Sequence, residues 1–385
     1  MFDDFLDDPD DELIDIDEEE GGDTPSVAGL NVSRENGDLQ GHESVEKNLI
    51  DILNSGSVPH AMMFAGPEGI GKSLMAYRLA RHVLKHGVGN DGQDSLFGET
   101  PAAVETFQMD PADPVFRQVA SGGHPDMMVV ERPMDDRKGE QKSSVDVDSA
   151  RKVVPFLRMT ASGDNGWRVV IVNDADTMNR NAQNAILKIL EEPPPRALLI
   201  LIVHRAGAML PTIRSRCRMI NFAPLPDNIV LDLMARHDPS LNKTDAAALA
   251  TMAEGRIGAA IRLLDEGGLE SVQAVLNLLG EWPEWDWVRI HQSADTLGRM
   301  GQETAYRGFE NIMMWTVQRL TFAKARGLDD PGAPLTAEPL RRMLAHYSLD
   351  EWLEICEKLR DHFSQIQIAN LDRRQGVLAA FACFH

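Results

Sequence analysis

A glycine-rich octapeptide, residues 66–73 with the sequence GPEGIGKS, is the part of the chain best suited to chemistry. It matches the pattern GxxxxGK[ST], in which backbone N–H groups wrap around phosphate oxygens and the start of the next helix adds a favourable dipole. In this pattern Lys72 would reach the β- and γ-phosphates, and the Ser73 hydroxyl would ligate Mg²⁺. The positions that would contact a nucleotide or its metal ion are Gly66, Gly69, Gly71, Lys72, Ser73 and, from a later segment, Asn173. We therefore expect a nucleotide loop that could take ATP with Mg²⁺.

A second polar segment directly follows the apolar run 169–172. Hydrolysis by such a site needs an acidic residue after a neighbouring strand to hold Mg²⁺, often followed by a Glu that orients water. Here Asn173, an uncharged amide, comes first, and Asp174 stands in the Glu position with a shorter side chain. A shifted register would make Asp174 the metal partner, and the water-orienting position would then fall on Ala175 or Asp176. Either set is incomplete, so Asp174 is a weak catalytic candidate and we expect nucleotide binding with little or no hydrolysis.

The elements that must position these residues alternate between strand-like and helical patterns. Short apolar runs occupy residues 61–65, 127–131, 168–172, 197–203 and 219–222. Helical patterns lie at 44–55, at 72–86, after an N-cap at Asp146 or Asp148, and around 182–190, where Pro193 ends the helix. The alternation predicts an α/β domain with a parallel five-stranded sheet that is covered on both faces.

From Pro224 onward the strand-like runs stop and helical patterns remain. We expect the α/β domain to span residues 38–223, followed by a small helical lid domain at 224–268 and an all-α C-terminal domain at 269–385. Helix breaks are expected near Pro283, Gly301, residues 327–334 and Ser348. The C-terminal domain carries no catalytic signature, which favours a role in oligomerisation.

Residues 1–37 are predicted to form a disordered acidic tail. Residues 1–23 contain 13 acidic side chains and no Lys or Arg, and without them the net charge of −22 becomes −9. A block of like charges repels itself and buries little apolar surface. Its scattered apolar residues would also suit a docking peptide. The remaining charge gives no strong basic footprint for DNA, so partners would supply most phosphate contacts.

The cysteine count and the lengths of the apolar runs exclude several protein classes. Cys217, Cys356 and Cys383 are too few for a four-cysteine zinc site or a disulfide framework. No run approaches the ~18 apolar residues that cross a bilayer. No basic region followed by an apolar stretch opens the chain. We therefore expect a cytoplasmic protein without a zinc site.

Two longer motifs suggest a family. Residues 184–194 read NAILKILEEPP, and residues 210–218 after the next apolar run read LPTIRSRCR. Shorter elements, GHES at 41–44 and GGHPD at 122–126, precede the first helix and the second strand. In this order the motifs resemble the AAA+ P-loop subunits of bacterial DNA polymerase III clamp loaders, over about residues 39–268.

This resemblance implies both a fold and a set of partners. The fold would be an AAA+ domain with its helical lid. The partners would be other clamp-loader subunits, of delta and gamma or tau type, in a hetero-oligomeric ring. Such a ring loads a sliding clamp onto primed DNA during replication.

The resemblance also implies a role for Arg216, the arginine of the Ser-Arg-Cys element. In the family this arginine is placed, in trans, at the ATP of a neighbouring subunit. A guanidinium suits that role because its charge is permanent and its planar donors match phosphate oxygens. By residue type alone Arg216 could equally form a structural pair, since Arg214 and Arg218 stand beside it. With the resemblance we expect an arginine finger.

Departures from the family pattern separate the chain from its ATP-hydrolysing motor subunits. Motor subunits carry a nucleotide-sensing arginine at the start of a lid helix, where this chain has Gly258; Arg256 would point elsewhere on the helix. Many relatives carry a four-cysteine zinc module where residues 87–123 contain no cysteine. With Asn173, these differences imply an accessory, stator-like subunit that binds nucleotide weakly or structurally.

Two alternatives remain open from the sequence. The first is a motor subunit that hydrolyses its own ATP with Lys72, Ser73 and Asp174. It predicts turnover by the isolated chain and loss of clamp loading in Lys72→Ala. The second is a stand-alone nucleotide-binding regulatory module, which predicts a monomer that captures no other subunit.

Overall fold

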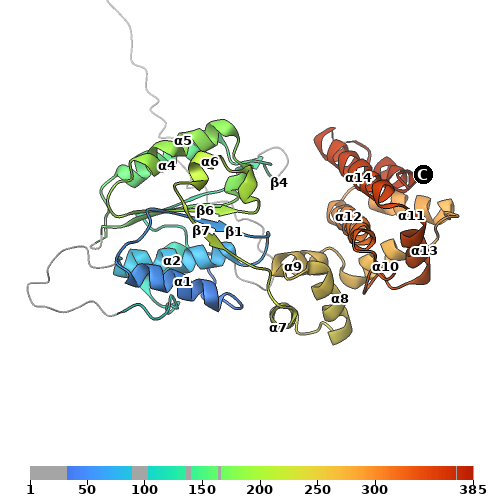
Figure 1. The fold of residues 1–385 in the computed structure, drawn as a ribbon, viewed down its shortest axis with the longest axis horizontal. Coiled ribbons are helices and arrows are strands. Elements are labelled where there is room, and N and C mark those ends of the chain that lie inside the picture. Colours follow the sequence, from blue (N-terminus) through green and yellow to red (C-terminus); the bar gives the residue numbers. More distant parts are fainter. Residues whose placement is uncertain (1–32, 89–102, 136–139, 164–165, 370, 385) are drawn as a thin grey trace, which may run out of the picture.

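The computed structural model describes residues 33–88, 103–135, 140–163, 166–369 and 371–384. A sheet domain, three short helices and a C-terminal group of longer helices follow one another along the chain. The three short helices join the two larger lobes (Figure 1).

The sheet domain contains five parallel strands, as the apolar runs predict. They are β1 (Ala61–Ala65), β2 (Met127–Val130), β5 (Arg168–Val172), β6 (Ala197–Val203) and β7 (Arg218–Asn221). Their order is β2-β5-β6-β1-β7, so β1 lies between β6 and β7. Every residue of β1, β5 and β6 is buried, which explains why these strands read as continuous apolar runs. The predicted parallel α/β sheet is confirmed.

Helices cover both faces of the sheet. On one side lie α1 (Glu43–Asn54) and α2 (Lys72–His86), and on the other lie α4 (Val147–Arg158), α5 (Arg180–Glu191) and α6 (Pro211–Arg214) (Figure 1). The short helix α3 (Pro114–Ala120) packs on the side of α1 and α2. Alternate β1 side chains serve the two cores: Phe64 packs with α1 and α2, whereas Met63 packs with α4 and α5. Asp146 caps α4 by accepting from the Ser149 N–H, so it is the first of the two candidate aspartates that begins this helix.

Three short elements had no sequence signal that we recognised. A two-stranded antiparallel hairpin pairs β3 (Met134–Asp135) with β4 (Glu140–Gln141). Two 3₁₀ turns, η1 (Ala175–Thr177) and η2 (Ala206–Ala208), follow β5 and β6. The turns matter for function because they shape the edge of the sheet where the nucleotide loop lies.

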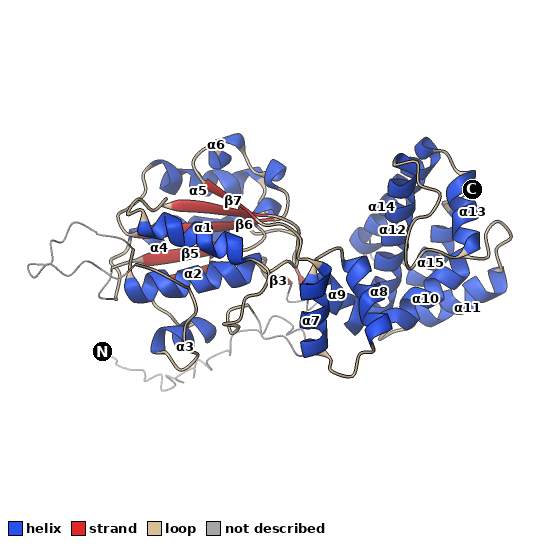
Figure 2. Cartoon of the chain, turned by 60° about the horizontal axis from the view of Figure 1, so that its bottom comes forward, coloured by secondary structure: helices blue, strands red, loops and turns tan. Residues whose placement is uncertain are grey.

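Helices form the rest of the described chain (Figure 2). The short group is α7 (Asp227–His237), α8 (Lys243–Ala253) and α9 (Ile257–Asp265), which share a small core of their own. The C-terminal group is α10 (Gly268–Leu279), α11 (Trp287–Leu297), α12 (Glu303–Ala325), α13 (Glu338–His346), α14 (Leu349–Ala369) and α15 (Arg373–Ala382). At their junction the buried Glu266 accepts hydrogen bonds from the Asn311 amide on α12.

The predicted tail, residues 1–37, needs a correction at its C-terminal end. Residues 1–32 lie outside the described residues. Residues 34–37, by contrast, are held against α2, because the Arg78 and Arg81 guanidinium groups donate to backbone carbonyls of Gly37, Asn36 and Arg34. Two arginines on one helix thus fix a segment whose composition alone reads as part of the tail.

Among the helices of the described part, none combines the length and apolar character needed to cross a bilayer. The same residues hold no group of three or more His, Cys, Asp or Glu placed to bind a metal ion. Residues 89–102, within the cysteine-free stretch 87–123, lie outside the described residues.

Candidate nucleotide site and arginine finger

The backbone of residues 66–73 requires its glycines. A Cβ on Gly66 would lie 2.5 Å from the carbonyl oxygen of Phe222, and φ is 75° at Gly69 and 102° at Gly71. Side chains other than glycine adopt such positive φ values only with strain. Gly71 also precedes the first turn of α2, which begins at Lys72. The loop therefore has the tight turn and helix entry that a phosphate-binding loop needs.

The Lys72 side chain is turned back into this loop and is only 3% exposed. Its Nζ donates to the carbonyl oxygens of Gly66 at 2.8 Å and Pro67 at 2.5 Å, and lies 3.0 Å from Nδ1 of His204. An ammonium group has three hydrogens to donate, so these partners use all of them. Burial lowers the pKa of Lys72 to about 8, although nearby carboxylates oppose the shift. At neutral pH the amine keeps its charge and is satisfied by its own chain.

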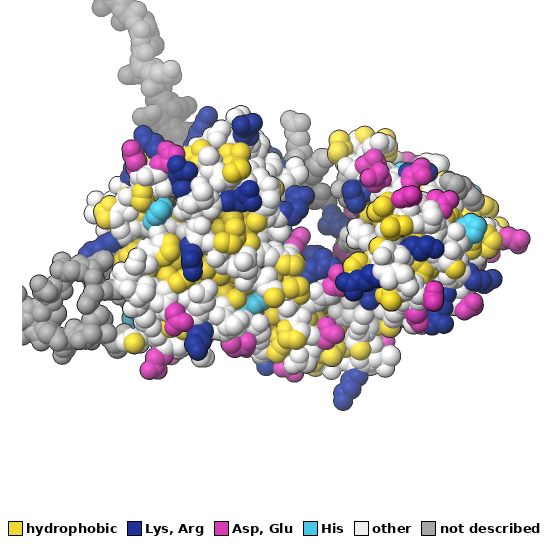
Figure 3. Space-filling view, in the orientation of Figure 1, with side chains coloured by type: hydrophobic (Ala, Val, Ile, Leu, Met, Phe, Trp, Pro, Cys, Tyr) yellow, Lys and Arg dark blue, Asp and Glu magenta, His cyan; other side chains and the backbone are white. Residues whose placement is uncertain are grey.

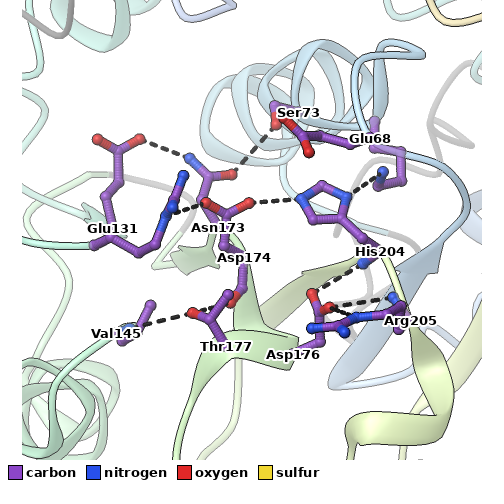
Figure 4. Close-up of polar contacts among 12 residues, drawn as sticks. Glu68, Ser73, Glu131, Val145, Asn173, Asp174, Asp176, Thr177, His204 and Arg205 are labelled. Carbon is purple, nitrogen blue, oxygen red and sulfur yellow. Dashed lines mark hydrogen bonds and ion pairs between the residues drawn. The ribbon is translucent and has the colours of Figure 1, made fainter. Parts of the chain in front are cut away.

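His204, the first residue after β6, links Lys72 to the second polar segment. Because Lys72 can only donate, Nδ1 of His204 must accept, and the ring proton must lie on Nε2. Nε2 donates to Oδ1 of Asp174 at 2.7 Å. The backbone N–H of His204 donates to Oδ1 of Asp176 at 2.9 Å, which fixes the residue at the end of the strand. A chain of hydrogen bonds thus runs from Lys72 through His204 to Asp174. Figure 4 shows the part between His204 and Asp174.

Asn173 occupies the position opposite Ser73. The Ser73 hydroxyl donates to Oδ1 of Asn173 at 3.3 Å, and Nδ2 of Asn173 donates to Oε1 of Glu131 at 2.6 Å. This geometry corresponds to the register in which Asn173 takes the metal position. A hydroxyl and an amide oxygen are acceptable Mg²⁺ ligands, but the carboxylate that usually holds the ion is missing beside Ser73. The residues therefore fit Mg²⁺ and ATP only in part.

Asp174, the weak catalytic candidate, has both carboxylate oxygens engaged. Oδ1 accepts from His204, and Oδ2 lies 2.7 Å from Nε of Arg132. Burial would raise the pKa of Asp174, but the hydrogen bond from His204 and the charge of Arg132 outweigh burial and lower it. Its backbone is left-handed, with φ of 49°. A carboxylate held in this way is poorly placed to orient an attacking water.

The lid lies directly on the loop. The Gly258 N–H at the start of α9 donates to the Gly69 carbonyl at 2.9 Å, and a Cβ on Gly258 would lie 2.9 Å from Cα of Gly69. Beside this contact, Nη1 of Arg262 lies 3.2 Å from Oε1 of Glu68. Arg256 instead donates from Nε to a backbone carbonyl within the lid. A close backbone contact therefore stands where motor subunits of the resembled family sense nucleotide.

Arg216 lies between α6 and β7, and its side chain is 37% exposed. Its Nη2 lies 3.2 Å from Oε1 of Glu191, the last residue of α5, and its Nη1 donates to the Thr212 carbonyl at 3.1 Å. Arg214 and Arg218 are also exposed. The structure brings the two long motifs together, since a glutamate from the first holds the arginine of the second at the surface.

Three residues that shape these sites were missed from the sequence: His204, Arg132 and Glu191. A signal existed for His204, because it directly follows the longest apolar run, at the edge of the sheet where β1 also ends. Arg132 lies two residues beyond the end of β2, at the same edge of the sheet. Glu191 belongs to a motif that we noted for its resemblance, without a physical role.

Comparisons with known proteins found similar proteins that take part in DNA replication. The family described as "DNA polymerase III, delta subunit" matches residues 41–226. The DNA polymerase III subunit delta′ of Pseudomonas aeruginosa is 33% identical over 225 residues, 57% of this chain and 61% of that protein. The Escherichia coli subunit delta′ is 26% identical over 245 residues, 63% of this chain and 66% of that protein. The matches thus span less than two thirds of these curated relatives' lengths, if only narrowly for the second.

A solved DNA polymerase III gamma subunit-related protein from Thermotoga maritima aligns over 90% of this chain and 98% of that chain, with 17% identity and a TM-score of 0.41.

A glycine-rich loop between a buried strand and a helix, in a parallel five-stranded sheet followed by a helical lid, defines a P-loop protein of the AAA+ class. The sequence matches then specify the family. Over residues 41–226 the chain matches the DNA polymerase III delta subunit family, and it is similar to DNA polymerase III delta′ subunits. The resemblance inferred from its motifs is confirmed.

Proposed function

We propose that this chain is an accessory, stator-like subunit of a DNA polymerase III clamp loader, with Arg216 completing the ATP site of a neighbouring subunit. One contrast carries the proposal. The guanidinium of Arg216 is held at the surface by Glu191, whereas the chain's own loop is satisfied internally. An exposed, permanently charged donor is suited to an anion on another molecule.

The chain's own nucleotide site supports a weak or structural role. The metal position holds Asn173, Asp174 is paired on both oxygens, and Gly258 replaces a sensing side chain. These features disfavour the first alternative, a motor subunit, because hydrolysis needs a metal-holding carboxylate and an oriented water. Nucleotide bound here would brace the subunit and would turn over slowly or not at all.

The proposed partners are those implied by the similarity to DNA polymerase III delta′ subunits. We place the chain in a hetero-oligomeric cytoplasmic ring with subunits of delta and gamma or tau type, acting on a sliding clamp and primed DNA. The C-terminal helices expose apolar side chains suited to lasting contacts, among them Phe322, Leu353 and Ile368. These surfaces favour assembly over the second alternative, a stand-alone regulatory module. Lys and Arg are interspersed with Asp and Glu on the face shown in Figure 3, which fits a subunit whose partners make most DNA contacts.

The test is the ATP turnover of a clamp loader assembled with Arg216→Ala. We expect assembly to be unchanged and turnover at the site that Arg216 serves to fall by roughly 10³-fold, in the range typical of arginine fingers. Arg214→Ala is the matched control, because it removes an exposed arginine two residues away. Equal turnover in the Arg216 and wild-type complexes would remove the finger from the proposal.

A further inference from the structure

His204 has no assigned role in the proposed function, yet it connects the two halves of the nucleotide site. It stands between the ammonium of Lys72 on α2 and the carboxylate of Asp174 after β5, and its side chain is 21% exposed. Its backbone is anchored separately through Asp176. The position of the imidazole ring therefore does not depend on Lys72, and the ring can hold the Lys72 ammonium by accepting its hydrogen bond.

The bonds of Lys72 compete with phosphate. A nucleotide in this loop would need the Lys72 ammonium to turn toward the β- and γ-phosphates. Turning breaks hydrogen bonds to two loop carbonyls and to His204. The carbonyl bonds are local to the loop. The bond to His204 is different, because that ring is itself held by the charged Asp174, which favours Nδ1 as an acceptor.

We propose that His204 is a positioning residue that holds Lys72 inside its own loop and so weakens binding of nucleoside triphosphates there. This hydrogen bond between His204 and Lys72 explains how a chain with an intact glycine-rich motif can bind nucleotide only weakly. The inference rests on the proposed function only in treating this loop as a weak site. It does not involve Arg216, so failure of the arginine-finger test leaves it standing.

The test measures binding of Mg²⁺-ATP and Mg²⁺-ADP to the full chain by titration calorimetry. His204→Leu keeps much of the volume of the ring but offers no hydrogen bond, so we expect ATP to bind about tenfold more tightly. His204→Gln is the conservative variant, since its amide oxygen can accept from Lys72 and its amide nitrogen can donate to Asp174. We expect His204→Gln to bind as weakly as the wild type. Thermal unfolding checks that each variant is folded.

Two further variants make the result decisive. In the double variant His204→Leu/Lys72→Ala the gain in ATP affinity should disappear, because that gain depends on a freed Lys72 ammonium group. Asp174→Asn weakens the hold on His204 without touching the ring and should give a smaller gain, which also serves if His204→Leu fails to fold. Unchanged binding in both His204→Leu and Asp174→Asn would overturn the proposal. So would an equal gain in His204→Gln, or a gain that survives loss of Lys72.

Discussion

The loop at residues 66–73 and the loop that carries Arg216 each present a cation that could bind phosphate, but the two cations differ in exposure and in their partners. In the first, the cation is 3% exposed and all three of its hydrogens are bound by the same chain. In the second, the cation is 37% exposed and is tethered by a single glutamate and one carbonyl. A sequence motif therefore indicates which ligand a loop could bind. The hydrogen-bond partners of its cation indicate whether that cation is available to the ligand.

The largest effect should come from separating the lid from the loop with Gly258→Ala. The new Cβ would lie 2.9 Å from the backbone of Gly69, which cannot move as a side chain tip can. We expect the free energy of unfolding to fall by about 1–3 kcal/mol, as for other overpacked contacts. Denaturant unfolding of the full chain measures this change.

Gly207→Ala is the control for that substitution, because a Cβ there meets nothing within 4 Å. If the two variants unfold at the same denaturant concentration, the contact between Gly258 and Gly69 is not a tight one. The description of residues 66–73 as a loop covered by the lid would then be wrong.

A smaller effect should follow from releasing Arg216 with Glu191→Gln. The pair is exposed at both ends, with side-chain exposures of 37% and 52%, so it adds little stability. It does limit the positions of the guanidinium. We expect turnover of the assembled complex to fall by about fivefold or less, with the stability of the chain unchanged, since exposed pairs contribute about 0–1 kcal/mol.

Glu192→Gln is the comparison for this measurement, because Glu192 pairs with Arg158 instead. A complex in which Glu191→Gln and Glu192→Gln turn over ATP equally would show that the tether has no part in placing Arg216.

The smallest effect is expected in the isolated chain. Its ATP hydrolysis should not exceed that of its Lys72→Ala variant, because the metal position holds an amide and Asp174 is paired on both oxygens. Phosphate release under single-turnover conditions measures both rates. Faster hydrolysis by the wild-type chain would favour the motor-subunit alternative. It would also contradict the view that Lys72 is unavailable to nucleotide whereas Arg216 is available to a neighbour.

The fold was predictable because its signals are local. Strands buried on both faces read as apolar runs, and the start of α4 was narrowed to two aspartates by capping chemistry alone. The β3–β4 hairpin is too short to leave an apolar pattern. Residues 34–37 carried no sign of their contacts, because the groups that hold them are arginines in the middle of α2.

The candidate site was only partly predictable. The sequence supplied Lys72, Ser73 and Asn173, but two registers remained open until the amide was seen to face Ser73. The place of His204 after the longest apolar run indicates the edge of the sheet, but it does not indicate which side chains the ring contacts. Its role depends on β6 lying next to β1, which is a property of the sheet order and not of any one segment.

We propose that this chain acts through the Arg216 guanidinium, which it offers to a neighbouring subunit. The most direct measurement is an experimental structure of the assembled clamp loader with a non-hydrolysable ATP analogue. We predict that the Arg216 guanidinium lies within hydrogen-bond distance, about 3 Å, of a phosphate oxygen bound to the adjoining subunit. An Arg216 side chain that still pairs with Glu191 and points away from every triphosphate in the ring would contradict the claim.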